Sequence, residues 1–240
     1  MSNPVLNNVR ASQSGTLRGS GSLNLDDVVT STGFLLALTA FSAVATAFVV
    51  PPATQMVALS LGGLIAFGMC LVLMFTQLRF NPVAVGVFAA LEGVVLGALS
   101  NAYAYLYDGV VIGAVAGTTI GFAGMLAAYK FFDLQLSSKT RKIVIISMWG
   151  FIGVALFDVV LLMLGSAIGF NGFGPLGIAM SLVGVVLSAF FMLMDFQDVE
   201  AAIAAGAGKE YRWALGLGLL ISLVWMYTNL LHLLGALSND

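Results

Sequence analysis

Long runs of apolar residues fill most of this chain, and short polar stretches separate them. Seven of the runs are long enough to cross the ~30 Å hydrocarbon core of a bilayer as helices. Because lipid offers the backbone no hydrogen bonds, each run should be α-helical, and the alternating pattern of a membrane barrel does not occur in them. The predicted spans are residues 31–50, 56–77, 83–105, 110–131, 143–165, 174–195 and 213–236.

Composition supports the same fold class, an all-α integral membrane protein. Hydrophobic residues make up 60% of the chain and charged residues 8%, whereas a soluble domain carries roughly 25% charged residues. The net charge of -2 argues against nucleic acid as a partner, since that needs a basic surface. Cys70 is the one cysteine, which excludes a disulfide within one chain. We predict no metal site and no cofactor.

The domain organisation follows from the same pattern. We expect residues 1–25 to be a mobile polar cytoplasmic tail and residues 26–240 to form a single seven-helix membrane domain. Asp26 and Asp27 come just before the first predicted span, where acidic side chains satisfy the free N–H groups of a helix start.

Orientation follows from the basic residues, which occur in the tail and after the second, fourth and sixth spans. The positive-inside rule places that side in the cytoplasm, so the N-terminus is inside and the C-terminus outside. The residues concerned are Arg10, Arg18, Arg79, Lys130, Lys139, Arg141, Lys142, Lys209 and Arg212.

Two long polar connections follow the fourth and sixth spans, at 130–142 and 195–213. The second begins within "FFMLMDFQDVE" at 190–200, which places Asp195 at the cytoplasmic mouth of the sixth span. Asp198 and Glu200 are interpreted as solvated or interfacial groups beyond it. Asp195 follows the apolar run directly and is a candidate functional carboxylate.

Two further carboxylates lie inside predicted spans, where facing lipid would be costly. At 1.5 Å per residue, Glu92 lies roughly 15 Å from the start of its span near Pro82 and Asp158 roughly 24 Å from Lys142. They either line an interior path at different depths or serve as hydrogen-bonded groups that hold helices together. For Asp158, the wholly apolar surroundings favour the structural role.

No catalytic site is apparent, and we predict that the protein is not an enzyme. Asp158 and Asp195 are at opposite ends of their helices, His232 has no serine in a strained, glycine-flanked site, and no "HExxH" motif occurs. His232, near the outer end of the seventh span, is expected to pack or to meet water at the interface.

Three segments in order carry a family resemblance: "NPVAVGVFAALEGVVLGALS" at 81–100, "LMDFQDVE" at 193–200 and "WMYTNLLHLLGALS" at 225–238. They resemble the Bax inhibitor-1/YccA family, the transmembrane Bax inhibitor motif proteins. The entry segments Asn3–Val5 and Asp26–Val29 resemble its bacterial branch. The resemblance implies location in a bacterial cytoplasmic membrane and a fold in which the last helix is central and the other six surround it.

The resemblance also implies a pH-sensitive calcium leak, governed in well-known members by two aspartates that share a proton and latch the pore closed. The first aspartate corresponds to Asp195. The expected position of the second is occupied by Ser222, which hydrogen-bonds but does not titrate. Arg79 occupies the connection where the family carries an arginine near the cytoplasmic mouth.

Two functions of different classes therefore stay open. The first is a leak for Ca²⁺ or another cation, either alone or coupled to H⁺, with Glu92, Asp195 and Asp158 in the path or gate, since oxygen ligands suit Ca²⁺. Arg79 and Ser222 are then candidate gate partners. The second, suggested by the YccA branch, is a non-transporting regulator that binds another membrane protein such as a membrane-anchored quality-control protease.

Overall fold

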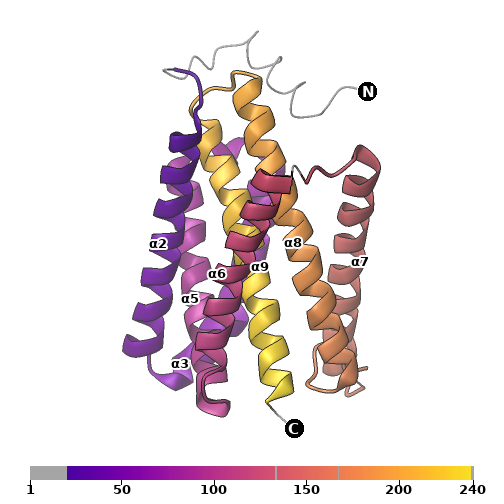
Figure 1. Ribbon diagram of the computed structural model, residues 1–240. Coiled ribbons are helices and arrows are strands. Elements are labelled where there is room, and N and C mark those ends of the chain that lie inside the picture. The colour runs from indigo at the N-terminus through magenta and orange to yellow at the C-terminus, as the bar shows by residue number, and fades with distance from the viewer. Residues whose placement is uncertain (1–20, 133, 167, 239–240) are drawn as a thin grey trace. The chain divides into compact units, whose positions relative to one another are not determined.

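The structure is a computed structural model that describes residues 21–132, 134–166 and 168–238 (Figure 1). Among the described residues, every long secondary-structure element is a helix, which confirms the predicted all-α class. Its elements are α2 (Leu25–Val49), α3 (Pro52–Val57), the π-helix η1 (Ala58–Gly62), α4 (Gly63–Phe75), the 3-10 helix η2 (Gln77–Phe80), α5 (Pro82–Leu106), α6 (Val110–Phe132), α7 (Ser138–Met163), α8 (Pro175–Ala204) and α9 (Tyr211–Leu237).

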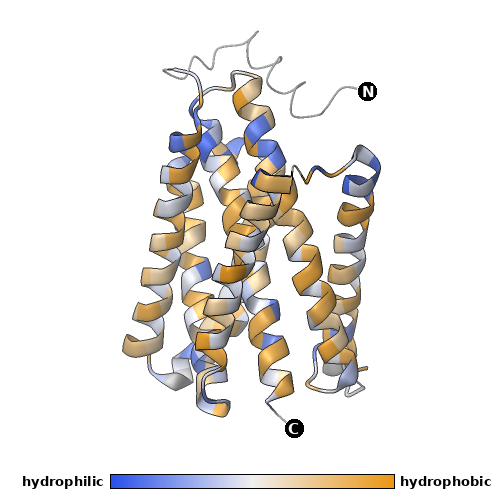
Figure 2. Ribbon diagram, in the orientation of Figure 1, coloured by the Kyte–Doolittle hydropathy of each residue, from blue (hydrophilic) through white to orange (hydrophobic). Residues whose placement is uncertain are grey.

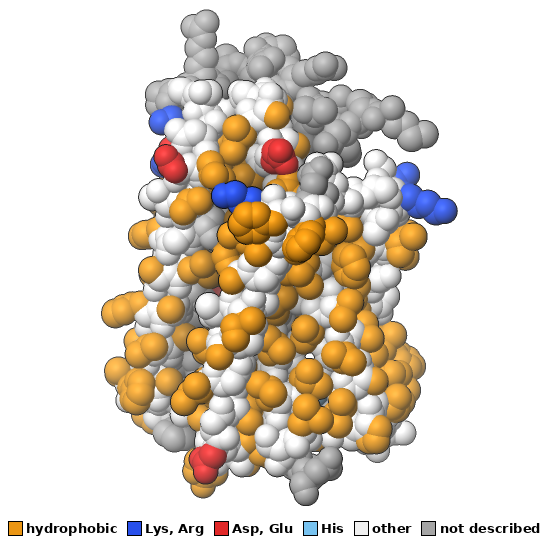
Figure 3. Space-filling model, viewed as in Figure 1, with side chains coloured by type: hydrophobic (Ala, Val, Ile, Leu, Met, Phe, Trp, Pro, Cys, Tyr) orange, Lys and Arg blue, Asp and Glu red, His pale blue; other side chains and the backbone are white. Residues whose placement is uncertain are grey.

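Within the described residues, seven helices are long and apolar enough to span a membrane, and α3, η1 and α4 together supply the second of them. Figure 2 shows that apolar residues occur all along these helices. Hydrophobic side chains are also spread over the helix surface seen in Figure 3, and Phe48, Ile112 and Met163 are 86%, 77% and 82% exposed. Helices that are apolar on every side are stable in lipid and not in water.

Helix α8 differs from the sequence-based prediction at its C-terminal end. The polar connection expected from residue 195 is wrong, because the helix continues to Ala204 and includes Asp195, Asp198 and Glu200. Buried Val199 and Ala202 anchor this extension by packing. The helix ends in a Schellman turn: Gly206 has φ 65°, and the N–H of Ala207 donates to the carbonyl of Ala202 at 3.1 Å.

The contacts divide the chain into two compact units. The first unit comprises the residues up to Leu99 together with Asp195–Leu220. In it, α5 packs on α2 so closely that a Cβ at Gly97 would lie 2.9 Å from the Ala43 Cα. The Thr39 hydroxyl crosses the same interface and donates to the Ala89 carbonyl at 3.0 Å.

The second unit comprises Ser100–Met194 and Ile221–Asp240. Within it, α9 contacts each of the other helices. Glycines of α6 pack against large α9 side chains, as between Gly117 and Leu230, and the Trp225 ring lies 5.6 Å from both Phe151 of α7 and Phe191 of α8. The Ser100 and Tyr227 hydroxyls of α5 and α9 are 2.7 Å apart. The single domain and the arrangement of six helices around α9 stay predictions.

Candidate functional site

The five candidate site residues predicted from the sequence are divided between the two compact units. Arg79, Glu92 and Asp195 belong to the first unit, whereas Asp158 and Ser222 belong to the second. The geometry around each residue shows what holds it.

Glu92 is half-buried on α5, in the middle of a long apolar helix. The next residue, Gly93, faces α2, where an added Cβ would come within 2.7 Å of the Ser42 Cβ. Val95, one turn beyond Glu92, contacts the π-helix η1, since a Cβ at Gly62 would lie 3.2 Å from its Cγ2. Residues three apart share a helix face, so Glu92 lies on the side of α5 that faces η1 and not on the face that packs against α2.

Asp195 is half-buried on α8, and its carboxylate lies against α9. At Gly218 of α9, an added Cβ would lie 3.0 Å from Asp195 Oδ1. The sequence prediction placed Asp195 at a helix end. The structure instead places it inside α8, packed against the backbone of the next helix.

Arg79 lies in η2, the short 3-10 helix between α4 and α5. Its guanidinium lies 4.9 Å from the centre of the Phe80 ring, and Phe80 packs on Tyr211 at a ring distance of 4.7 Å. Arg79 Nη1 also donates to the Met74 carbonyl at 3.5 Å. These contacts connect the α4–α5 turn to the start of α9.

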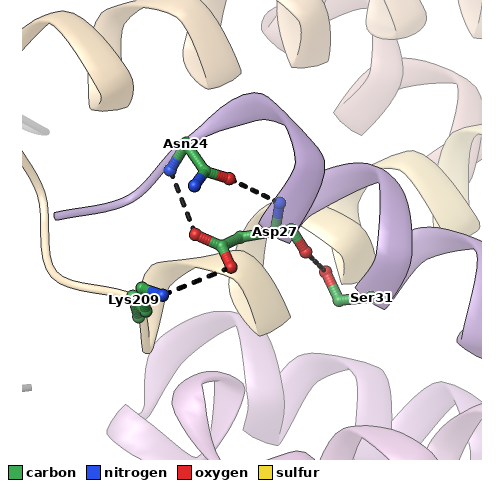
Figure 4. Close-up of polar contacts among 4 residues, drawn as sticks. All are labelled: Asn24, Asp27, Ser31 and Lys209. Atoms are coloured by element: carbon green, nitrogen blue, oxygen red, sulfur yellow. Dashed lines mark hydrogen bonds and ion pairs between the residues drawn. The ribbon is translucent and has the colours of Figure 1, made fainter. Parts of the chain in front are cut away.

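Figure 4 shows a polar cluster at the start of α2 that also includes Lys209, which is far away in the sequence. Asn24 caps the helix by accepting from the N–H of Asp27 at 2.9 Å, and the Asp27 carboxylate accepts from the N–H of Asn24 at 3.2 Å. This reciprocal capping box confirms the predicted capping role of Asp27, although Asp27 lies within the first helical turn and not before it.

The same cluster fixes the turn between α8 and α9. Lys209 of that turn lies 3.8 Å from Asp27 Oδ1, and the N–H of Leu23 donates to the Ala207 carbonyl at 2.8 Å. Ser31 of α2 donates to the Arg212 carbonyl in the first turn of α9 at 2.9 Å. The turn that leads from the Asp195 helix into α9 is therefore held by the start of α2.

Asp158, buried at 2% exposure near the end of α7, binds the loop that follows it. Its Oδ1 accepts from the N–H groups of Ile168 and Gly169 at 2.8 and 3.1 Å. Its Oδ2 accepts from the backbone and side-chain nitrogens of Asn171 at 2.9 and 3.1 Å. Four donors occupy this carboxylate, which favours the structural role for Asp158 over a place in an ion path.

His232 holds the other side of the same loop. Its Nε2 lies 3.1 Å from the Gly172 carbonyl, its Nδ1 lies 2.7 Å from the Tyr103 hydroxyl, and its ring stacks on Phe173 at 5.1 Å. A carbonyl only accepts, so Nε2 donates to Gly172, and in that tautomer Nδ1 accepts a hydrogen bond from the Tyr103 hydroxyl. His232 therefore packs, as predicted, and also makes two hydrogen bonds that the sequence did not indicate.

Ser222 is buried at 3% exposure on α9, one helical turn beyond Gly218. Its role as a partner of Asp195 stays a prediction. In the part of the chain that the structure describes, no group of three or more His, Cys, Asp or Glu side chains is arranged to hold a metal ion.

Comparison with known proteins gives one finding for nearly the whole chain. The model for the Bax inhibitor 1 like family matches residues 3–239. A search of curated proteins finds no match. The family match confirms the resemblance seen in the sequence segments, and it agrees with the seven long apolar helices. The chain is an integral membrane protein with seven spans and belongs to the Bax inhibitor 1 like family.

Proposed function

We propose that this protein is an ion leak of the Bax inhibitor-1 type that passes Ca²⁺, with Glu92 and Asp195 in the path or gate. The supporting observation is that both carboxylates lie half-buried within apolar spanning helices of the same compact unit. A carboxylate facing hydrocarbon is costly, so such groups face protein or water and are functional candidates. Carboxylate oxygens are also ligands that Ca²⁺ prefers.

The packing around both residues supports this proposal. The Asp195 carboxylate lies against α9 at Gly218, and Glu92 lies on the side of α5 that faces η1. Asp158 is not included in the proposed path, because its oxygens already accept four hydrogen bonds from the α7–α8 loop.

The proposed setting is a bacterial cytoplasmic membrane, with the N-terminus inside and the C-terminus outside. It rests on the distribution of lysine and arginine along the chain. The lipid bilayer is the immediate partner, and Ca²⁺ is the transported ion.

The test is Ca²⁺ flux into liposomes that contain purified protein and an internal Ca²⁺ indicator. We expect Glu92→Gln to lower the initial rate and Asp195→Asn to change it, each by about tenfold, which corresponds to about 1.4 kcal/mol in a barrier. The matched control is Glu200→Gln, which neutralises an exposed acid on the same helix as Asp195.

Wild-type vesicles that take up Ca²⁺ no faster than protein-free vesicles would overturn the leak. The regulator that binds a membrane-anchored quality-control protease would then be the better explanation. Wild-type rates in both carboxylate variants would show that the leak, if present, uses another route.

A further inference from the structure

Gly218 of α9 faces the Asp195 carboxylate. A Cβ at this position would lie 3.0 Å from Oδ1 and 3.7 Å from Cγ of Asp195. Ordinary van der Waals contact of a Cβ begins at 3.4 Å. Any residue other than glycine would therefore displace the carboxylate by about 0.4 Å or more from its place against the α9 backbone.

The α-helical conformation of α9 does not itself require a glycine at position 218. Gly218 lies inside α9 with helical backbone, where glycine costs about 1 kcal/mol relative to alanine. The neighbouring Gly216 serves a different contact, since a Cβ there would lie 3.3 and 3.2 Å from the hydroxyl oxygens of Ser31 and Thr32 on α2. The two glycines let α9 approach α2 through one face and the Asp195 carboxylate through another.

The turn before α9 limits how far α8 and α9 can move apart to relieve this contact. The Schellman turn at Gly206 fixes the end of α8, and the Leu23–Ala207 hydrogen bond holds the turn to α2. The Lys209–Asp27 ion pair, drawn in Figure 4, holds the turn to α2 as well. Because α8 and α9 are joined through this held turn, a side chain at 218 would move the carboxylate more readily than it would move the helices.

We infer that Gly218 is a positioning residue for the Asp195 carboxylate. Because Gly218 has no side chain, the carboxylate can lie against the backbone of α9. The inference rests on the proposed function for its effect on ion flux, but the position of the carboxylate is measurable without flux.

The flux experiment compares Gly218→Ala in the wild-type background and in Asp195→Ala, where the clashing carboxylate is absent. We expect Gly218→Ala to change the initial rate of Ca²⁺ uptake by about threefold or more in the first background and by less than about 1.3-fold in the second, because contacting residues are energetically coupled. Gly124→Ala, at an exposed α6 position with nothing within 4 Å of the added Cβ, is the control and should leave the rate unchanged.

A second measurement needs no flux. Carbodiimide labelling of Asp195, followed by peptide mass spectrometry, should be about threefold faster in Gly218→Ala and unchanged in Gly124→Ala. Equal labelling in wild type and Gly218→Ala would overturn the inference, as would an equal effect of Gly218→Ala in both flux backgrounds. A labelling change without any Ca²⁺ flux would instead support the inference and overturn the proposed leak.

Discussion

The contact between α2 and α5 gives the sharpest stability prediction. A methyl group at Gly97 would overlap the Ala43 carbonyl oxygen and lie 2.9 Å from the Ala43 Cα. Since ordinary contact begins at 3.4 Å, Gly97→Ala must separate the two backbones by at least 3.4 − 2.9, or about 0.5 Å. The obstructing atoms are backbone, so no side-chain rotation relieves the contact.

The magnitude is a balance of two effects. Gly→Ala in a helix interior gains about 1 kcal/mol, and overpacking costs about 1–3 kcal/mol. Because two rigid helices meet at this point, we take the upper cost and expect Gly97→Ala to destabilise the protein by about 2 kcal/mol. The Thr39–Ala89 hydrogen bond, which crosses the same interface, should weaken as the helices separate.

The assay is thermal unfolding of the purified protein in detergent, followed by tryptophan fluorescence. The matched controls are Gly124→Ala and Gly150→Ala, whose added Cβ atoms meet nothing within 4 Å. These should unfold at or slightly above the wild-type temperature, whereas Gly97→Ala should unfold several degrees below it. If Gly97→Ala were as stable as the two controls, the close α2–α5 packing would be wrong.

Three further predictions address the loop, the cap and the topology. Asp158→Asn should speed hydrogen exchange at residues 168–171, because an amide nitrogen in place of Oδ2 cannot accept from Asn171. The same substitution should leave the Ca²⁺ flux unchanged. A changed flux with wild-type hydrogen exchange would instead place Asp158 in the ion path. Asp27→Ala should lower the stability of the protein by about 1 kcal/mol through loss of the capping box. Lys209→Ala should lower it by less, because the ion pair is long and the lysine side chain is 42% exposed. Equal losses of stability in thermal unfolding, or a larger loss for Lys209→Ala, would contradict this ranking. A reporter fused after Asp240 should lie outside the cytoplasm and one in the 130–142 connection inside; finding both on one side would refute the seven-span topology.

The sequence alone determined the membrane environment and the number of spans. Hydropathy is a local property, and lipid requires each apolar run of about 20 residues to satisfy its own backbone as a helix. The capping role of Asp27 was also predictable, since a cap involves residues three apart in the chain. The three ordered segments indicated the family, which the match over residues 3–239 confirms.

The tertiary structure decided what each ionisable group contacts. The sequence marked Asp195 as the end of a span, but packing of Val199 and Ala202 extends α8 beyond it. Asp158 has apolar neighbours in sequence, and its donors are in the loop after α7, the first of them ten residues later. Lys209 and Asp27 meet from opposite ends of the chain. The local hydropathy pattern shows whether a segment prefers lipid or water. The contacts of Asp195, Asp158 and Lys209 depend instead on which distant segments pack together, and packing between helices decides that.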